Sequence, residues 1–127
     1  MKVTSATAVL IVDHVEATRD FFLKVGYEVM FSIPDGTQIG FVGLGKDGAQ
    51  VMVESRGNSH EGATFQALSK ESRRAVLFIE VDNLEVVISC LEGQKVVAPR
   101  HTTFYKSDEL TYEEPGGNLI TFARFDR

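Results

Sequence analysis

The amino-acid sequence predicts an α+β fold made of two βαβββ units, and three observations support it. A stretch in which an apolar run is followed by Asp occurs twice, at 8–16, where the Asp is residue 13, and at 75–85, where it is residue 82. A Glu follows each Asp three residues later, which is the pattern of a helix capping box. Aligning Asp13 with Asp82 gives an offset of 69 residues, and turn signals after each expected helix divide the chain into three more strands.

The first unit is expected over about 5–55. Residues 6–12 are mostly Ala, Val, Leu and Ile, which favours a strand covered on both faces. We expect Asp13 to cap a helix that runs to about Val25, and Gly26 to end it in the left-handed conformation. Turns at Pro34-Asp35-Gly36 and Gly45-Lys46-Asp47-Gly48 then separate three strands, expected at 27–33, 38–44 and 50–55.

A connection rich in Gly, Ser, His, Glu and Arg is expected over 56–73, where Phe65 and Leu68 could hold a short helix in place. The second unit, 74–125, repeats the order with a strand at 75–81 and a helix from about Asn83 to Glu92. Its remaining strands are expected at 95–98, where Pro99 should stop the strand, at 109–113 and at 119–124, with a polar loop over 100–107.

Composition narrows the function classes. The chain has 127 residues, enough for one domain, and a net charge of −5 without a cluster of Lys and Arg, which argues against nucleic-acid binding. No apolar run is long enough to cross a bilayer. The single Cys90 cannot form an internal disulfide, and no charged-then-apolar leader precedes Val3, so a cytoplasmic location is expected.

The segment Glu113-Glu114-Pro115-Gly116-Gly117-Asn118-Leu119-Ile120 and the paired βαβββ order resemble the vicinal oxygen chelate superfamily. This group includes glyoxalase I, extradiol dioxygenases, fosfomycin-resistance transferases and bleomycin-resistance proteins. The resemblance implies that both units form one cupped mixed sheet over a single domain, 1–127. It also implies a site on the concave side, usually completed by a second copy in a homodimer.

In the metal-dependent members, each first strand and each last strand supplies one ligand. The resemblance puts these positions at Ala6, Ala75, Met52 and Thr121, although Glu54 could replace Met52. Two alanines cannot donate, and Thr and Met are weak ligands for hard or borderline ions. We therefore expect no metal and no other cofactor, with a divalent metal as the alternative.

The histidines and the cysteine are expected to lie outside any metal site. His14 follows a helix cap and should be solvated, and His60 lies in the connection. His101 falls in the long polar loop, which could border a cavity. Cys90 is expected to be a small core residue late in the second helix.

The remaining pattern suits a binding cleft. Ala6, Ala8, Ala75 and Thr121 leave room, and Glu54 or Glu109 could supply a counter-charge. Core packing is favoured for Phe31 and Phe41, whereas Phe104 and Tyr105 fit a core or a wall. The predicted ligand-binding residues are Glu54, Met52, Phe41, His101, Phe104, Tyr105, Tyr112 and Thr121.

Function is expected to be metal-independent sequestration of a planar or cationic small molecule by a homodimer, as the resemblance to bleomycin-resistance proteins implies. One alternative is a lyase or dioxygenase whose ion is held by Glu54 and loop residues such as His101. Another is a cofactor-free enzyme in which Glu54 acts as general base. A third is an interaction domain that keeps only a vestigial pocket.

Overall fold

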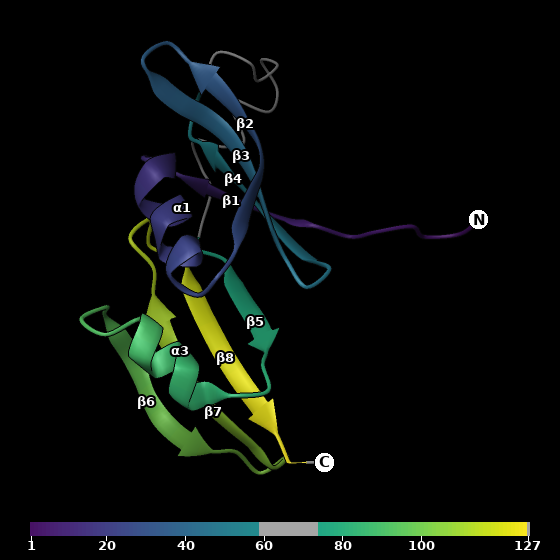
Figure 1. Ribbon diagram of the computed structural model, residues 1–127, viewed down its shortest axis with the longest axis vertical. Coiled ribbons are helices and arrows are strands. Elements are labelled where there is room, and N and C mark those ends of the chain that lie inside the picture. Colours follow the sequence, from purple (N-terminus) through teal and green to yellow (C-terminus); the bar gives the residue numbers. More distant parts are fainter. Residues whose placement is uncertain (59–73, 127) are drawn as a thin grey trace. The chain divides into compact units, whose positions relative to one another are not determined.

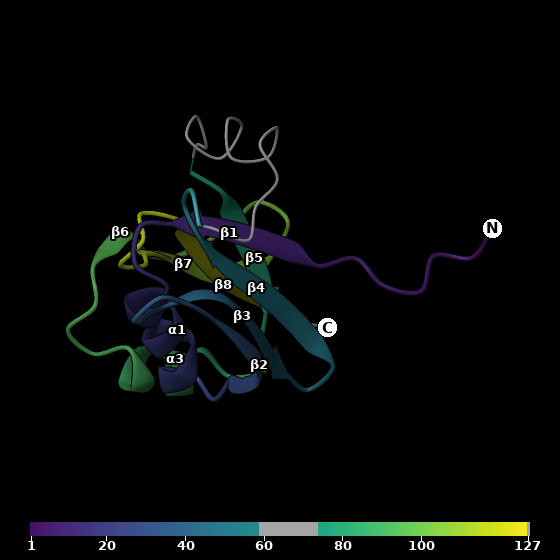
Figure 2. The same cartoon turned by 90° about the horizontal axis from the view of Figure 1, so that it is seen from above.

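The computed structural model describes residues 1–58 and 74–126, and the chain divides into two compact units, Met1–Arg73 and Arg74–Arg127. Each unit has a four-stranded sheet with a helix on one face (Figures 1 and 2). His60 and the helix expected around Phe65 and Leu68 lie outside the described residues. Within the described ranges, every helix is too short or too polar to span a membrane.

Unit 1 has the predicted βαβββ order. Its elements are β1 (Ala8–Val12), α1 (Val15–Lys24), β2 (Glu28–Asp35), β3 (Gln38–Lys46) and β4 (Ala49–Ser55). The strand order is β1-β4-β3-β2, in which β1 runs parallel to β4 and the other neighbours are antiparallel. Gly26 ends the first helical segment with a φ of +94°, so its predicted left-handed conformation is confirmed.

The core of unit 1 lies between α1 and one face of the sheet. Alternate strand residues point to α1 and are at most 1% exposed: Leu10, Val12, Val42, Leu44, Val51 and Val53. Val15, Phe21 and Phe22 of α1 complete this core. On the other face of β1, Val9 is 41% exposed. The prediction that this strand is covered on both faces is therefore wrong.

Both helices begin one residue later than the capping-box pattern predicted. The N-cap of α1 is His14, which is exposed as expected and makes no side-chain cap hydrogen bond. The Asp13 carboxylate instead accepts a hydrogen bond from Arg56 Nε, and Glu16 accepts one from the Ile39 amide at 2.8 Å. Tertiary partners thus take both carboxylates away from the helix terminus.

In unit 2 the cap moves by the same single residue, so the 69-residue offset still relates the two units. Asn83 caps α3 (Leu84–Cys90), and its side chain accepts a hydrogen bond from the Val86 amide at 3.2 Å. Leu84, Val87 and Leu91 are buried, whereas Cys90 is exposed. The expectation that Cys90 is a core residue is wrong because the buried stripe of the helix passes through Leu91.

The sheet of unit 2 contains β5 (Val76–Glu80), β6 (Val96–Thr102), β7 (Ser107–Glu113) and β8 (Leu119–Phe125), in the order β5-β8-β7-β6. Strand β6 continues through Pro99, contrary to the prediction. It is an edge strand, and the register shifts between Ala98 and His101, so a residue without an amide hydrogen fits there. His101 consequently lies in a strand and pairs with Glu109, not in a loop.

The segment that resembles the superfamily most closely has a structural role here. Glu114 is 1% exposed and accepts hydrogen bonds from the amides of Gly116 and Asn118 and from Asn118 Nδ2. Asn118 Oδ1 accepts a hydrogen bond from the Ala75 amide at 2.9 Å. These contacts shape the turn before β8 and fix the start of β5 beside it.

Candidate functional site

The face of the first sheet that α1 leaves uncovered, called here the open face of unit 1, carries all three predicted ligand-binding residues of this unit. Strand register places Met52 and Glu54 of β4 on it, beside Phe41 of β3 and Ile11 of β1. Glu54 is only 8% exposed. The structure therefore brings together Met52, Glu54 and Phe41, as the two-residue period of a strand predicts.

Phe31 covers part of this open face because Gly43 leaves room for its ring. A Cβ at residue 43 would lie 2.1 Å from Phe31 Cε2, so a side chain there would displace the ring. The ring stacks on Phe41 with centroids 5.4 Å apart and an interplanar angle of 20°. Phe31 stays 37% exposed, so this aromatic pair lies at the surface and not in the core favoured from the sequence.

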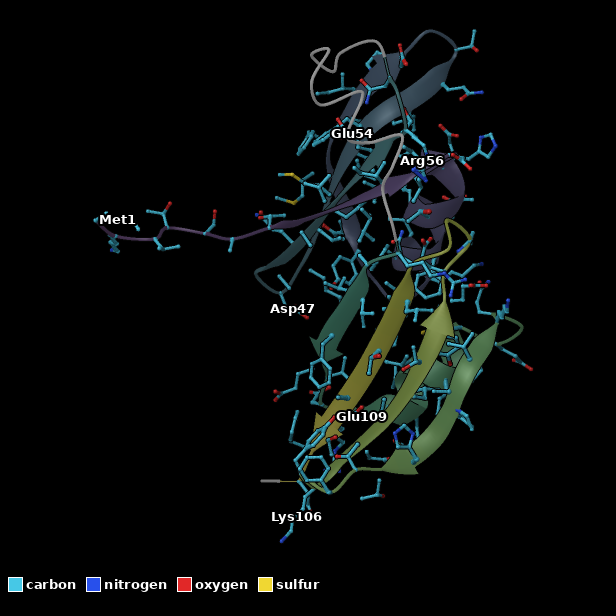
Figure 3. All side chains as sticks on the ribbon, turned by 180° about the vertical axis from the view of Figure 1, so that it is seen from behind. Met1, Asp47, Glu54, Arg56, Lys106 and Glu109 are labelled. Atoms are coloured by element: carbon cyan, nitrogen blue, oxygen red, sulfur yellow. The ribbon has the colours of Figure 1, made fainter. Side chains whose placement is uncertain are left out.

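The open face of unit 2 is the face that α3 leaves uncovered. Strand register aligns Phe78, Thr121 and Thr111 across it, and the Thr111 and Thr121 hydroxyls are 2.7 Å apart. Glu109 lies on this same face (Figure 3). It is 6% exposed, and its neighbours in register are Ala123 on one side and His101 on the other.

Two hydroxyl groups hold the Glu109 carboxylate. Tyr105 Oη and Ser107 Oγ each donate a hydrogen bond to Oε2 at 2.5 Å. The Ser107 hydroxyl lies 2.8 Å from the Thr103 hydroxyl, and this contact continues the network into the hairpin loop. Tyr105 and Glu109, four residues apart in the sequence, are thus brought into direct contact by the hairpin between β6 and β7.

An aromatic row runs beside Glu109. The Phe125 ring lies 6.3 Å from Phe78 and 6.1 Å from Tyr105, and Tyr105 lies 5.0 Å from Phe104 in an edge-on contact. These rings are poorly buried: Phe78 is 49% exposed, Tyr105 45% and Phe104 96%. Exposed aromatic rings next to a buried carboxylate are typical of a binding surface.

Two predicted site residues are placed differently. Tyr112 lies on the opposite face of β7 from Glu109, is 2% exposed and packs edge-on against Phe122, so it belongs to the hydrophobic core. Burial raises the pKa of the Tyr112 phenol. His101 is exposed, and its Nδ1 lies 2.8 Å from the Pro99 carbonyl oxygen instead of contacting Glu109.

Ion pairs shift the pKa of several carboxyl groups away from Glu109. Hydrogen bonds from Arg100 lower the pKa of Asp108 and that of Glu85, and both carboxylates raise the pKa of Arg100. At the far end of β7, the hydrogen bond from Lys95 lowers the pKa of Glu113, and Arg74 pairs with the same carboxylate. These charged groups pair with one another and require no ligand.

Two surface hollows formed by described residues contain neither Glu54 nor Glu109 in their lining. One of about 350 Å³ in unit 1 is lined by Gly26, Glu28, Met30, Gly45, Lys46, Asp47, Gly48, Ala49 and Gln50. Another of about 490 Å³ in unit 2 is lined by Glu80, Val81, Asp82, Arg124 and Phe125. Only the second touches the aromatic row, through Phe125. The candidate site is therefore defined by the open faces and not by these hollows.

The later helix caps also correct the expected metal positions. Counting back from His14 and Asn83, instead of from the Asp residues, moves the first-strand positions from Ala6 and Ala75 to Thr7 and Val76. The register agrees, since Ala8 pairs with buried Val51 while Val76 lies in phase with Phe78 on the open face. Ala8 thus lies on the face that α1 covers, and Ala6 and Ala75 lie outside the bounds of β1 and β5, so the strand register does not support the room expected at these alanines.

The donor set does not fit a divalent ion after this correction. The four positions hold Thr7, Val76, Met52 and Thr121, which offer two hydroxyls and a thioether but no imidazole or carboxylate. Among the described residues, no three or more His, Cys, Asp and Glu side chains form a group that could hold a metal ion. Glu54 alone would bind an ion weakly.

Two βαβββ units with an uncovered sheet face are the fold of the glyoxalase/bleomycin-resistance/dioxygenase proteins, the vicinal oxygen chelate fold, so the predicted resemblance is confirmed at the level of fold. Solved structures with this fold include TioX from Micromonospora sp. ML1. TioX is 18% identical, with 98% of this chain and 100% of that chain covered and a TM-score of 0.75.

A glyoxalase/bleomycin resistance protein/dioxygenase family enzyme from Burkholderia phytofirmans PsJN is also 18% identical. The match covers 94% of this chain and 97% of that chain, with a TM-score of 0.71. A similarly described protein from Nocardioides is 18% identical over 98% and 85% of the two chains, with a TM-score of 0.72. No protein-family model and no curated protein matches the sequence.

Proposed function

We propose that the protein binds a planar or cationic small molecule on its open faces without a metal ion and sequesters it unchanged. The observation that carries the proposal is the pairing of a nearly buried carboxylate with surface aromatic rings on each open face. Unit 1 supplies Glu54 with Phe41 and Phe31, and unit 2 supplies Glu109 with Tyr105 and Phe125.

Both groups favour the same kind of ligand. The faces of aromatic rings attract flat molecules by stacking and attract cations through the ring quadrupole. A carboxylate that is largely buried from solvent adds a counter-charge for a cation. Met52 can adapt to the shape of a ligand because its side chain is flexible. Weak ligands at Thr7, Met52 and Thr121, and a side chain without a donor at Val76, support a role that does not depend on a metal. We assign Glu54, Met52, Phe41, His101, Phe104, Tyr105 and Thr121 to the binding surface.

The proposal includes a homodimer and a cytoplasmic setting. Two copies would complete the cleft, as the resemblance implies, and the exposed free thiol of Cys90 favours a reducing compartment. Light scattering on the eluting protein should give about 28 kDa, twice the 14.0 kDa of the chain. A mass of one chain at working concentration would contradict the dimeric cleft, and recovery in a membrane or extracellular fraction would contradict the location.

Calorimetric titration tests the binding itself. Protein treated with a chelator should bind bleomycin or a planar cation such as 9-aminoacridine saturably, with Phe41→Leu weakening the affinity. Val86→Ala, on the exposed side of α3, is the matched control and should leave the affinity unchanged. The absence of any binding, or turnover of a substrate that requires an added metal, would overturn the proposal.

A further inference from the structure

We infer that Glu109 is the hydrogen-bond acceptor for an N–H group of a cationic ligand, so the ligands of this face are protonated amines or protonated heteroaromatic rings and not quaternary ammonium ions. This inference rests on the proposed function and concerns the open face of unit 2 only. It starts from an imbalance between the two oxygens of one buried carboxylate.

Both hydroxyl donors bind the same oxygen of Glu109. Tyr105 and Ser107 donate to Oε2, whereas Oε1 receives no hydrogen bond from any residue in 1–58 or 74–126. A carboxylate oxygen in a residue that is 6% exposed has lost most of its contact with water. Leaving such an acceptor without a donor costs free energy, so this oxygen is suited to a donor supplied from outside the chain.

Glu113 shows the ordinary arrangement on the same strand and the same face. Its carboxylate receives one cation from Lys95 Nζ at 2.7 Å and a second from Arg74. Glu109, four residues earlier, has no Lys or Arg within ion-pair distance among the described residues. The described residues therefore supply two cationic partners to Glu113 at one end of β7 and none to Glu109 at the other.

The hydroxyl network holds the Glu109 charge in place without neutralising it. Hydroxyl-to-carboxylate hydrogen bonds near 2.5–2.7 Å are typical of an ionised acceptor. Because Thr103 contacts Ser107 and Ser107 contacts Oε2, the carboxylate is fixed from the loop and from its own strand. A side chain fixed in this way loses little conformational entropy when a ligand binds.

The aromatic row sets the shape of the rest of the ligand. Phe125 lies between Phe78 and Tyr105, with centroid distances of 6.3 and 6.1 Å, and Tyr105 also contacts Glu109. These rings are tilted to one another by 53° and 33°, and a flat cation over the face of one of them gains stacking and cation–π attraction whether or not it carries an N–H. Only a cation with an N–H can also donate to Oε1. Preference between two such cations therefore isolates the contribution of Glu109.

Fluorescence titration with two flat monocations of similar size tests this preference. 9-Aminoacridine is protonated at neutral pH and carries N–H donors, while 10-methylacridinium has the same charge and no N–H. The native protein should bind 9-aminoacridine about 10- to 100-fold more tightly, as expected for one hydrogen bond to a charged group. Glu109→Gln should abolish the preference, and the matched control Glu113→Gln should retain it.

Each outcome separates this inference from the proposed function. Equal affinity for the two probes, or a preference that survives Glu109→Gln, would overturn the inference and leave metal-free binding standing. Failure of both probes to bind would overturn the proposed function and the inference with it. If Glu109→Gln does not fold by circular dichroism, Glu109→Asp should lower the preference several-fold, because its shorter side chain withdraws the carboxylate from the ligand, and an unchanged preference would overturn the inference.

Discussion

Replacing Gly43 with alanine should expel the Phe31 ring from the open face of unit 1. The added Cβ would lie 2.1, 2.6 and 2.8 Å from three ring carbons of Phe31, so the two groups cannot coexist. The ring can leave because Phe31 is on the edge strand β2 and is already 37% exposed. The substitution therefore tests whether one missing side chain creates the aromatic surface.

The expected loss of stability follows from the contacts that the Phe31 ring loses. Losing the stacked pair with Phe41 costs about 0.5–1.5 kcal/mol, and exposing the buried part of Phe31 costs about 1–2 kcal/mol more. Replacing glycine with alanine also stabilises the fold by about 0.4–1 kcal/mol, because alanine lowers the conformational entropy of the unfolded chain. We expect Gly43→Ala to lower the free energy of unfolding by about 1–3 kcal/mol in total.

Urea denaturation of four proteins measures this effect as a double-mutant cycle. Without the ring, in a Phe31→Ala background, Gly43→Ala should be neutral or stabilising by up to about 1 kcal/mol. An equal loss of stability with and without the Phe31 ring would refute the reasoning, because the cost would then come from the backbone or from another neighbour. No loss in the native background would refute it as well.

Two further predictions concern unit 2. Asn118→Ala should lower the free energy of unfolding by about 2–3 kcal/mol in urea, since it leaves the Ala75 main-chain amide without its acceptor and removes one of the two hydrogen bonds that Asn118 donates to Glu114 Oε1; a change under about 0.5 kcal/mol would contradict this. Ionised Asp108 should stabilise the fold above the ordinary carboxyl pKa, and this stability should be lost as pH falls through its lowered pKa. Arg100→Met should therefore raise the pKa of Asp108 in an NMR titration, and an unchanged titration would show that Arg100 is not the cause.

Most of the fold could be predicted because the relevant signals are local. Apolar alternation and turn residues located the strands, and the 69-residue offset related the two units correctly. The errors arose where a distant partner decided the outcome. Asp13 and Glu16 have the spacing of a capping box, but Arg56 binds Asp13 and the Ile39 amide binds Glu16. These partners are distant in the sequence, so no local spacing predicts the two contacts.

The candidate site was predicted only in part for the same reason. Period-two alternation placed Met52 and Glu54 on one face, but a one-residue error in the cap selected Ala6 and Ala75 instead of Thr7 and Val76. The sequence offered Glu109 only as a possible counter-charge, because its contact with Tyr105 depends on the hairpin. Alternation of Ser107 and Glu109 along β7 was the available signal that two polar side chains share a face.

The turn before β8 has a consequence for recognising proteins of this kind. Every polar side chain in it that could bind a ligand is already used internally, by Glu114 closing the loop and by Asn118 joining two strands. The stretch that makes the chain easiest to classify therefore carries no chemical information about what the protein handles. In this chain, residues that contact a ligand are to be sought on the open faces of the two sheets and not in this turn.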